Sequence, residues 1–478
     1  MAEYKHLIGG EWVSSFEAME NINPSNTDDV VGVYASADEA QARDAVAAAS
    51  DAFASWSRSG VQQRFGCLDA IGTEILARKD ELGRLLAREE GKTLPEAIGE
   101  AARAGQIFKF FAGEALRLEG DSLPSVRPGV EVEVRREPLG VVGAITPWNF
   151  PIAIPAWKIA PALAYGNTVV CKPAELTPGC AWALAEIISR SGLPAGAFNL
   201  VMGSGAVVGQ ALLDDPRVKG ISFTGSVATG QRVAAACAGR GARYQLEMGG
   251  KNPLVVLADA DLEQAVEVAV NGAYFSTGQR CTASSRLIVD DAIHDRFVDA
   301  LSDRIAALRV DDALKAGTDI GPVVDQRQLD QDLDYLEIGR SEGARLVTGG
   351  ERLTRDTPGF YLAPALFADT DNAMRINREE IFGPVATTIR VADLDEALTV
   401  ANDTAFGLSA GICTRSLAAA TRFKRESAAG MVMVNLPTAG VDYHVPFGGT
   451  KGSSYGQREQ GRYANEFYTT VKTTYVGC

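Results

Sequence analysis

The stretch Val218-Lys-Gly-Ile-Ser-Phe-Thr-Gly-Ser-Val-Ala-Thr-Gly230 leads from an apolar run through a turn of small residues into a helical pattern. Residues 218–223 predict a buried strand, and residues 227–238 predict a helix. Backbone N–H groups at the start of a helix that follows a strand bind phosphate groups. The turn between them therefore indicates a pyrophosphate site in which the Ser226 hydroxyl takes part. The spacing alone is equally compatible with a purely structural turn.

The same alternation continues on both sides of this stretch. Short apolar runs alternate with helical patterns at 141–145, 152–164, 168–171, 180–191 and 254–257. Such alternation is typical of βαβ units around a parallel sheet. A second alternating region covers residues 259–440. The sequence therefore predicts an α/β fold.

Three segments lie outside this alternation. Residues 130–138 alternate valine with charged residues, and the tail 466–476 is rich in β-branched and aromatic residues. We expect these two segments to form a small sheet whose open edge pairs with another subunit. Residues 37–115 have apolar residues at helical spacing, which we interpret as scaffold.

Composition narrows the class of protein. The chain has 478 residues, enough for two or three domains, and a net charge of −15, which disfavours nucleic acid and anionic membranes as partners. No signal pattern and no apolar run of membrane-spanning length is found. The seven cysteines contain no CxxC pair, which argues against a disulfide framework and favours a reducing cytoplasm. Three scattered histidines are too few for a Ser-His-Asp triad or a metal site, so we expect no metal.

One cysteine has the surroundings of a nucleophile. Cys281 lies among small and polar residues and directly follows the cation Arg280. Glu247 stands 34 residues earlier, ahead of a Gly-Gly turn, and is a candidate base for this thiol. Together the two residues predict covalent catalysis through a thiolate.

A rigid turn surrounds Asn149 in the segment Ile145-Thr-Pro-Trp-Asn-Phe-Pro151. Its two prolines restrict the backbone, so we expect the Asn149 amide to be held in one place. A fixed amide N–H beside a nucleophile stabilises a developing oxyanion. An asparagine in a turn more often forms hydrogen bonds to the backbone of that turn. The residues alone leave both interpretations open.

Two other segments are candidates for a cofactor site. Lys172 and Glu175 follow the strand at 168–171, and the carboxyl ends of strands in an open α/β sheet face the ligand. Both side chains can form hydrogen bonds with ribose hydroxyls. A surface ion pair between Lys172 and Glu175 is an equally good interpretation of the same residues. Gly203–Gly209 is similar to a dinucleotide fingerprint with one residue too many, so we expect a structural turn there.

Seven motifs in order make the chain resemble the aldehyde dehydrogenase superfamily, from near residue 8 to the C-terminus. They are Pro147-Trp-Asn-Phe-Pro151, Lys172-Pro-Ala-Glu175, Phe223-Thr-Gly-Ser226, Glu247-Met-Gly-Gly-Lys251, Gly278-Gln-Arg-Cys281, Glu379-Glu-Ile-Phe-Gly-Pro-Val385 and Pro446-Phe-Gly-Gly449. The resemblance implies a Rossmann-type cofactor domain, an α/β catalytic domain and a small β oligomerisation arm. The implied ranges are 1–118 and 139–249 for the NAD(P)-binding domain, 250–440 for the catalytic domain, and 119–138 and 459–478 for the arm.

The resemblance also implies roles for single residues. Cys281 would be the nucleophile, Glu247 the base and Asn149 the oxyanion donor. Lys158 would lie near the active site, and Glu459 would be linked to proton release, although the segment before Glu459 is one residue longer than the family pattern. Residues implied to bind the cofactor are Ile145, Thr146, Pro147, Trp148, Lys172, Glu175, Gly225, Ser226, Gly249, Glu380 and Phe382.

The implied reaction is the NAD(P)-dependent oxidation of an aldehyde to a carboxylic acid. Cys281 would attack the carbonyl carbon, hydride would pass to the cofactor, and Glu247 would activate the water that hydrolyses the thioester. Family members that transfer the acyl group to coenzyme A lack this base, so Glu247 favours hydrolysis. Glu175 would accept hydrogen bonds from both ribose hydroxyls and repel a 2′-phosphate. This favours NAD, while Lys172 leaves NADP possible.

A resemblance to one branch of the superfamily indicates the class of substrate. Residues 435–446, 451–455 and 466–472 resemble the branch that contains α-ketoglutarate semialdehyde (2,5-dioxopentanoate) dehydrogenases. An anionic substrate of this kind would need a cation near Cys281. Arg280 is the candidate, with a structural salt bridge as its alternative.

Other classes of function are weighed against this one. A broad-specificity aliphatic or aromatic aldehyde dehydrogenase and a succinate-semialdehyde dehydrogenase are alternatives within the superfamily. A cysteine hydrolase would need a histidine base, and a cofactor-free binding protein would not need both Cys281 and Glu247. We expect a homodimer or homotetramer that acts on a small aldehyde in the cytoplasm.

Overall fold

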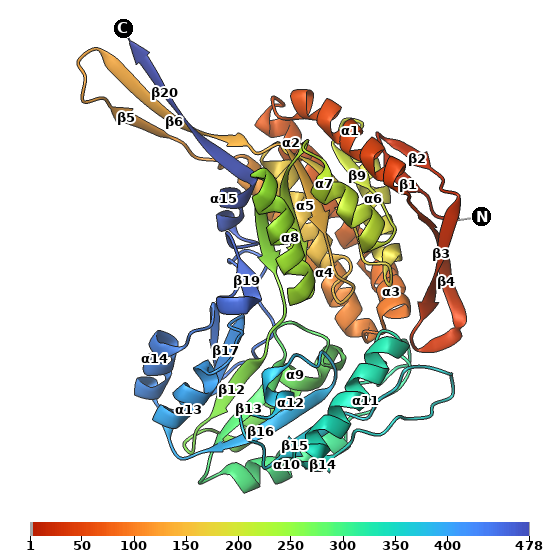
Figure 1. Ribbon diagram of the computed structural model, residues 1–478, viewed down its shortest axis with the longest axis vertical. Helices are drawn as coiled ribbons and strands as arrows, with labels where there is room; N and C mark the ends of the chain where they lie inside the picture. The colour runs from red at the N-terminus through yellow and green to blue at the C-terminus, as the bar shows by residue number, and fades with distance from the viewer. Residues whose placement is uncertain (1–2, 478) are drawn as a thin grey trace.

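The computed structural model describes residues 3–477, which form two lobes and an arm that projects from one of them (Figure 1). The first lobe is built on an eight-stranded sheet of order β19-β11-β10-β7-β8-β9-β1-β2. Its strands are β1 His6–Ile8, β2 Glu11–Val13, β7 Val141–Ile145, β8 Thr168–Lys172, β9 Phe198–Leu200, β10 Val218–Thr224, β11 Arg243–Glu247 and β19 Ser454–Tyr455. The strands from β11 to β9 are parallel, so their carboxyl ends meet at one edge of the sheet.

Helices cover both faces of this sheet. They are α1 Glu39–Trp56, α2 Val61–Ala77, α3 Lys79–Glu90, α4 Leu94–Ala115, α5 Ala153–Ala164, α6 Pro178–Ser189, α7 Gln210–Asp214 and α8 Val227–Arg240. Alternate residues of β8 face opposite layers, since Val169 belongs to one buried cluster and Val170 to another. On one face α2 and α4 approach closely, because a Cβ at Gly72 would lie 2.8 Å from the carbonyl oxygen of Gly105.

The second lobe has a seven-stranded sheet of order β14-β15-β16-β13-β12-β17-β18. Its strands are β12 Asn252–Val256, β13 Ser284–Asp290, β14 Arg345–Thr348, β15 Ala365–Ala368, β16 Val385–Val391, β17 Ser409–Cys413 and β18 Met431–Val434. All neighbours are parallel except β14 with β15. Its helices are α9 Leu262–Tyr274, α10 His294–Ala306, α11 Gln326–Ser341, α12 Arg375–Arg378, α13 Leu394–Asn402 and α14 Leu417–Glu426. Both predicted regions of α/β alternation are therefore confirmed.

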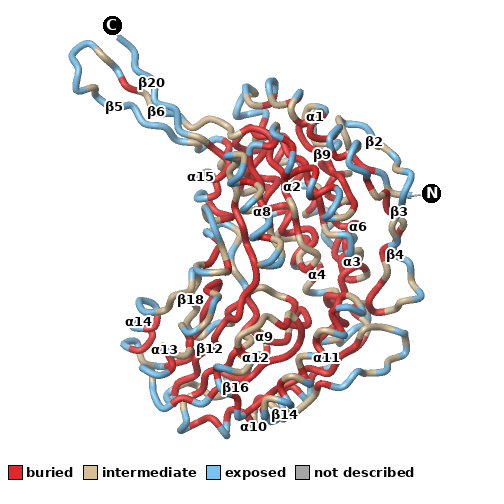
Figure 2. The backbone as a smooth tube through the Cα atoms, in the orientation of Figure 1, coloured by how far each residue is buried: buried red, intermediate tan, exposed pale blue. Residues whose placement is uncertain are grey.

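The arm is a three-stranded antiparallel sheet of β5 Asp121–Pro124, β6 Val130–Pro138 and β20 Thr469–Gly477. β6 and β20 pair along their whole length, which confirms the predicted association of these two distant segments. Figure 1 shows the arm extending away from both lobes, and Figure 2 shows most of it exposed. A separate hairpin, β3 Glu17–Asn23 with β4 Asn26–Ser36, lies on the far side of the first lobe.

The tail differs from its prediction at its start. Residues 466–468 were expected to be extended, and instead they lie in the short helix α15, Asn465–Tyr468. Phe467 and Tyr468 are both buried, with exposed fractions of 0% and 1%. A strand turns consecutive side chains to opposite faces, whereas a helical turn lets both aromatic rings pack against the first lobe. The strand prediction is therefore wrong for these residues.

The ends of the chain and its relation to membranes complete the description. Residues 1, 2 and 478 of the predicted domain ranges lie outside the described residues. Within residues 3–477, no helix has both the length and the apolar composition that crossing a bilayer requires.

Candidate active site

A cavity of about 440 Å³ lies between the two lobes, a volume typical of small-molecule sites. Cys281 from the second lobe and Asn149 from the first are both part of its wall. The predicted cofactor residues in the wall are Pro147, Trp148, Gly225, Ser226, Gly249, Glu380 and Phe382. The predicted residues outside it are Ile145, Thr146, Lys158, Lys172, Glu175, Glu247 and Glu459.

The loop that leads to Cys281 has an unusual backbone. Ser276, Thr277 and Gly278 have φ values of 52°, 56° and 66°. These lie in the left-handed region, which a β-branched residue rarely adopts. A Cβ at Gly278 would overlap the carbonyl oxygen of Gly383, so the loop packs against that segment only with glycine there. The loop is therefore held in a conformation that its own residues do not favour, and it delivers Cys281 to the cavity.

The Cys281 thiol is partly exposed at the cavity wall. Burial, with Glu380 and Glu247 nearby, raises its pKa, while the backbone N–H groups of Cys281 and Thr282 lower it. The thiolate, which is the nucleophilic form, is therefore disfavoured by these surroundings in the free protein. Asn252 Nδ2 donates to the Cys281 carbonyl oxygen at 2.7 Å and so fixes the backbone of the residue.

Asn149 is held from both sides. Its Nδ2 donates to the carbonyl oxygen of Gln279 at 2.9 Å, two residues before Cys281. An amide nitrogen carries two N–H groups, so the other remains free for a ligand. On the backbone side, Lys92 Nζ donates to the Asn149 carbonyl oxygen at 2.8 Å and pairs with Glu100 at 2.7 Å. A buried ion pair thus anchors the turn that carries the amide.

Glu247 is the last residue of β11 and lies at the carboxyl edge of the first sheet. Ser454 Oγ donates to Glu247 Oε2 at 2.5 Å, across the β11–β19 pairing. Burial and the neighbouring Glu459 raise the pKa of Glu247 well above its usual range, while Ser454, Lys158 and Arg458 lower it. A carboxylate whose pKa is raised is a stronger base than an ordinary one, which suits it to take a proton.

Lys158 and Glu459 are in direct contact, although one belongs to α5 and the other follows β19. Both side chains are buried, and both bond Ser222 Oγ, Lys158 at 2.8 Å and Glu459 at 3.0 Å. The additional residue before Glu459 does not keep it from Lys158. Its backbone pairs with that of Phe447, with N–O distances of 2.7 and 2.9 Å, which fixes the segment.

Glu380 and Gly249 form one end of the cavity. Gly250 N donates to Glu380 Oε1 at 2.8 Å. A Cβ at Gly249 would overlap the Glu380 carboxylate, so the close approach requires glycine. Burial raises the pKa of Glu380 to about 7, and the Gly250 N–H and Lys251 oppose this shift. Phe382 has a φ of 67° and its ring lies edge-on to Trp148, with centroids 5.4 Å apart.

The remaining predicted cofactor residues lie at the strand ends of the first sheet. Ser226 caps α8, and its hydroxyl accepts from Thr229 N at 3.4 Å. Lys172 Nζ donates to the Pro173 carbonyl oxygen at 2.9 Å, and burial lowers its pKa. Glu175 accepts from Gly205 N at 3.0 Å. Within the Gly203–Gly209 segment, Gly205–Gly209 form a π-helical turn ahead of α7, and the Gly205 N–H of this turn holds Glu175.

Ile145 and Thr146 connect this edge to the turn of Asn149. Ile145 ends β7, and Thr146 N donates to the Lys172 carbonyl oxygen at 3.1 Å. The Thr146 hydroxyl is buried and has no hydrogen-bond partner among residues 3–477. Both residues sit beside the cavity, and neither is part of its wall.

Comparison with known proteins decides the family. A sequence profile of the aldehyde dehydrogenase family matches residues 12–474. The chain belongs to the aldehyde dehydrogenase family. The predicted resemblance, the ALDH-like fold and the assignment to NAD(P)-dependent aldehyde dehydrogenases are thereby confirmed.

Individual relatives agree with this assignment. The chain is 44% identical to an alpha-ketoglutaric semialdehyde dehydrogenase of Bacillus subtilis, over 99% of this chain and 98% of the relative. It is 44% identical to an alpha-ketoglutarate semialdehyde dehydrogenase of Haloferax volcanii, over 98% of both chains. The crystal structure of betaine aldehyde dehydrogenase from Staphylococcus aureus in complex with NAD+ superposes with a TM-score of 0.97 at 35% identity, over 100% of this chain and 95% of that one.

The sequence did not reveal how α4 of this aldehyde dehydrogenase contributes to the site. Glu96 accepts from Ser276 N at 2.8 Å, in the loop before Cys281. Glu100 accepts from Ile152 N and Ala153 N at 3.2 Å each, beside the turn of Asn149. The scaffold interpretation of residues 37–115 was therefore incomplete. Charged residues at helical spacing on the otherwise alanine-rich buried face of α4 were the available signal.

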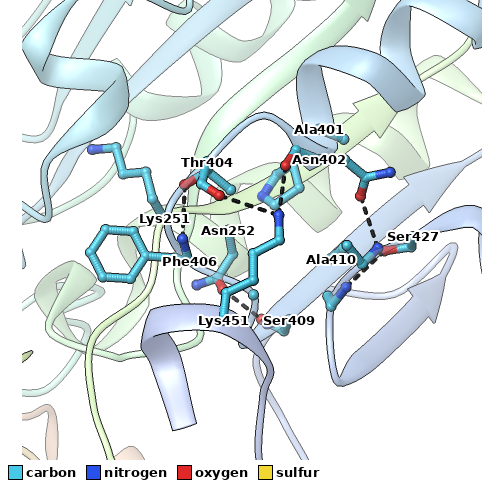
Figure 3. Close-up of a pocket in the computed structure, with 14 residues that line it drawn as sticks. Lys251, Asn252, Ala401, Asn402, Thr404, Phe406, Ser409, Ala410, Ser427 and Lys451 are labelled. Atoms are coloured by element: carbon cyan, nitrogen blue, oxygen red, sulfur yellow. Dashed lines mark hydrogen bonds between the residues drawn. The ribbon is translucent and has the colours of Figure 1, made fainter.

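A second hollow in the aldehyde dehydrogenase is too small to compete with the main cavity. It measures about 10 Å³ and lies between β12, β17 and the loop after α13 (Figure 3). Lys451 Nζ donates there to the carbonyl oxygens of Asn402 and Thr404, at 2.6 and 3.2 Å. Lys251 borders it too, and burial lowers the pKa of Lys251 to about 7. The hollow has room for no more than a single water.

Proposed function

We propose that the protein oxidises a semialdehyde such as α-ketoglutarate semialdehyde to the carboxylate, with NAD as hydride acceptor. The observation that carries the proposal is the convergence of Cys281 and Asn149 on one cavity, with the carboxylate of Glu247 behind them. A nucleophile, an amide donor and a base are the three groups that acyl chemistry through a thioester requires.

In this proposal Cys281 is the nucleophile. Its proton is released to solvent water in the cavity, and the thiolate attacks the aldehyde carbon. The developing alkoxide accepts hydrogen bonds from the free Asn149 N–H and from the Cys281 N–H. Loss of one such donor typically costs about 2.7–4 kcal/mol of transition-state stabilisation. When bound, NAD accepts the hydride, and a thioester to Cys281 is left.

Glu247 is the base for hydrolysis. It takes a proton from the water that attacks the thioester, and acid is released. The contact of Glu459 with Lys158 and their shared partner Ser222 provide a buried chain of polar groups beside Glu247. We propose that this chain passes the proton outward.

The residues present fit NAD. The start of α8 supplies backbone N–H groups for a pyrophosphate, with Gly225 and Ser226 in the cavity wall. The close approach of Gly249 to Glu380 leaves that carboxylate at the opposite end for the nicotinamide ribose. Glu175 would accept from the ribose hydroxyls and repel a 2′-phosphate, so we propose NAD as the preferred cofactor over NADP, with Lys172, Ile145, Thr146, Pro147, Trp148 and Phe382 completing the site.

The substrate proposal rests on the relatives. Two relatives at 44% identity carry names for α-ketoglutarate semialdehyde dehydrogenases and match nearly the whole chain. A broad-specificity aldehyde dehydrogenase or a succinate-semialdehyde dehydrogenase is the second candidate.

The assembly and location are also proposals. We infer a homodimer or homotetramer joined through the arm, and a division into the cofactor, catalytic and arm ranges given above. We place the enzyme in the cytoplasm, which agrees with the free state of the six cysteines among residues 3–477.

The experiment is a pre-steady-state assay with NAD and α-ketoglutarate semialdehyde. We expect Cys281→Ala to form no NADH. Glu247→Gln should give a burst of about one NADH per site and then turn over slowly, because acylation is intact and hydrolysis is not. Steady cycling of Glu247→Gln at the wild-type rate would exclude Glu247 as the base, and oxidation by Cys281→Ala would exclude the nucleophile.

A further inference from the structure

One face of α4 is directed at the active site. Glu96, Glu100 and Arg103 follow at spacings of four and three residues, so they lie on one side of the helix. Glu96 bonds the loop before Cys281, and Glu100 bonds the segment after Asn149. Arg103, the third residue of this row, has no such structural partner.

The surroundings of Arg103 are rich in donors, and its one side-chain acceptor among residues 3–477 is the neutral amide of Gln460. Its terminal nitrogen donates to Gln460 Oε1 at 3.1 Å, and its guanidinium lies over the Trp157 ring at 5.9 Å. Among residues 3–477 no carboxylate comes within ion-pairing distance of Arg103. The nearby Glu100 pairs with Lys92 instead. Burial lowers the pKa of Arg103, and the charges of Glu100, Asp442 and Cys281 raise it. The guanidinium remains a cation, as arginine does in proteins.

Three buried N–H donors at this place have no acceptor among residues 3–477. They are Arg103 Nε, Gln460 Nε2 and Trp157 Nε1. The orientation of the Gln460 amide is fixed, since arginine only donates and must face the amide oxygen. Buried donors without partners are unfavourable in the free protein and favour a ligand that accepts. A carboxylate offers two accepting oxygens and matches the fork of a guanidinium.

These donors lie next to residues that surround Glu247. Trp157 is adjacent to Lys158, and Gln460 is adjacent to Glu459, the two residues that contact each other. The Trp157 ring packs on Phe447 with centroids 5.4 Å apart, and a Cβ at the next residue, Gly448, would lie 2.8 Å from Glu247 Oε1. None of these residues is part of the cavity wall shared by Ser226 and Glu380.

We propose that Arg103, with Gln460 and Trp157, binds the distal carboxylate of an ω-carboxy aldehyde whose carbonyl is presented to Cys281. The inference rests on the proposed function and names the residue that sets its substrate class. Arg280 is less suited to this role. It donates to the Asn271 carbonyl oxygen near the end of α9 and lies 3.5 Å from that of Gly272, so its cationic group is tied to the backbone of its own lobe.

The test compares two aldehydes of equal chain length, pentanal and 5-oxopentanoate, by kcat/KM. We expect Arg103→Met to lower kcat/KM for 5-oxopentanoate by about 10²-fold, as expected when one partner of a buried charge pair is removed. Pentanal should be oxidised as by the wild type, and Arg103→Lys should recover part of the loss. Arg117→Met removes the same charge from an exposed position at the end of α4 and should change neither rate.

Glutarate, which carries no aldehyde, gives a second readout. It should inhibit pentanal oxidation by the wild type competitively and inhibit Arg103→Met far less, whether or not the variant is slower overall. Equal inhibition of the two, or an unchanged preference for 5-oxopentanoate in Arg103→Met, would overturn the inference. Loss of the preference in Arg280→Met alone would assign the carboxylate to Arg280 instead. A wild type that prefers pentanal would overturn the proposed substrate class itself, whatever the variants do.

Discussion

Glu247 is buried, and its carboxylate accepts a hydrogen bond from the Ser454 hydroxyl. This bond favours the ionised carboxylate and so lowers the pKa of Glu247 against the opposing effects of burial and Glu459. Its removal in Ser454→Ala should raise the pKa further, so that less of the base form exists at neutral pH. We expect steady-state turnover at neutral pH to fall about tenfold, since a hydrogen bond to a charged group contributes about 1.5–3 kcal/mol.

The pH profile of steady-state turnover distinguishes this effect from a loss of structure. The acid limb should move to higher pH in Ser454→Ala, and activity should recover as the pH rises. Ser454→Thr keeps the hydroxyl and serves as the control. Superimposed acid limbs for Ser454→Ala and the wild type would show that the bond does not control the base.

At the residue scale, local sequence suggests which side chains are candidates for catalysis. It does not show which residues from distant parts of the chain come into contact. Cys281, Glu247 and Asn149 became candidates because the residues around each of them restrict its conformation or its chemistry. Arg103 and Gln460 are 357 positions apart and meet only through the fold. No local pattern distinguishes Arg103 from a solvated helix arginine. Its contact with Gln460, which lies near the end of the chain, sets it apart, and that contact forms only in the folded protein.

At the element scale, the loop before Cys281 concentrates backbone strain. Positive φ is costly at Ser276 and Thr277, which carry a Cβ, and the surrounding contacts hold both residues in this conformation. Gly278→Ala adds a Cβ that overlaps the Gly383 carbonyl oxygen, so the loop must shift and Cys281 with it. We expect kcat/KM to drop about 10²-fold, the typical consequence of misplacing a reacting group by about 1 Å.

A glycine in open space provides the matched control for this variant. Gly66 lies inside α2, and a Cβ there would meet nothing within 4 Å. Gly66→Ala should leave kcat/KM unchanged and raise the free energy of unfolding by up to about 1 kcal/mol, from helix propensity alone. Wild-type kinetics for Gly278→Ala would mean that the loop tolerates the shift and that its strain is not functional.

Strand prediction succeeded where the elements are buried on both faces. Runs such as Val141–Ile145 and Leu254–Leu257 are apolar throughout and short, which a parallel sheet between helices requires. The left-handed loop at residues 276–278 could not be predicted, because serine and threonine rarely adopt positive φ and their presence does not indicate it. It is imposed by packing against the segment of Gly383, which is distant in the sequence.

At the scale of the whole molecule, the arm projects away from both lobes, and contacts within a single chain do not explain this shape. β20 is an edge of its sheet, and it is exposed from residue 471 onward. Pairing of β6 with β20 was predictable from alternation and β-propensity. The helical turn at Phe467 and Tyr468 was not, because the pocket that buries both rings belongs to the first lobe.

The arm therefore predicts the assembly. Val471 and Tyr475 lie on the same face of β20 with exposed fractions of 61% and 59%, and an exposed edge strand of this length is a template for pairing with another chain. The double variant Val471→Lys, Tyr475→Lys places two charges on that face without touching the core, so we expect a smaller species by size exclusion with light scattering and an unchanged circular dichroism spectrum. Leu417→Lys, on an apolar residue of α14 that is 80% exposed, is the control and should keep the wild-type mass. If the double variant also keeps that mass, the arm is not the contact that holds the subunits together.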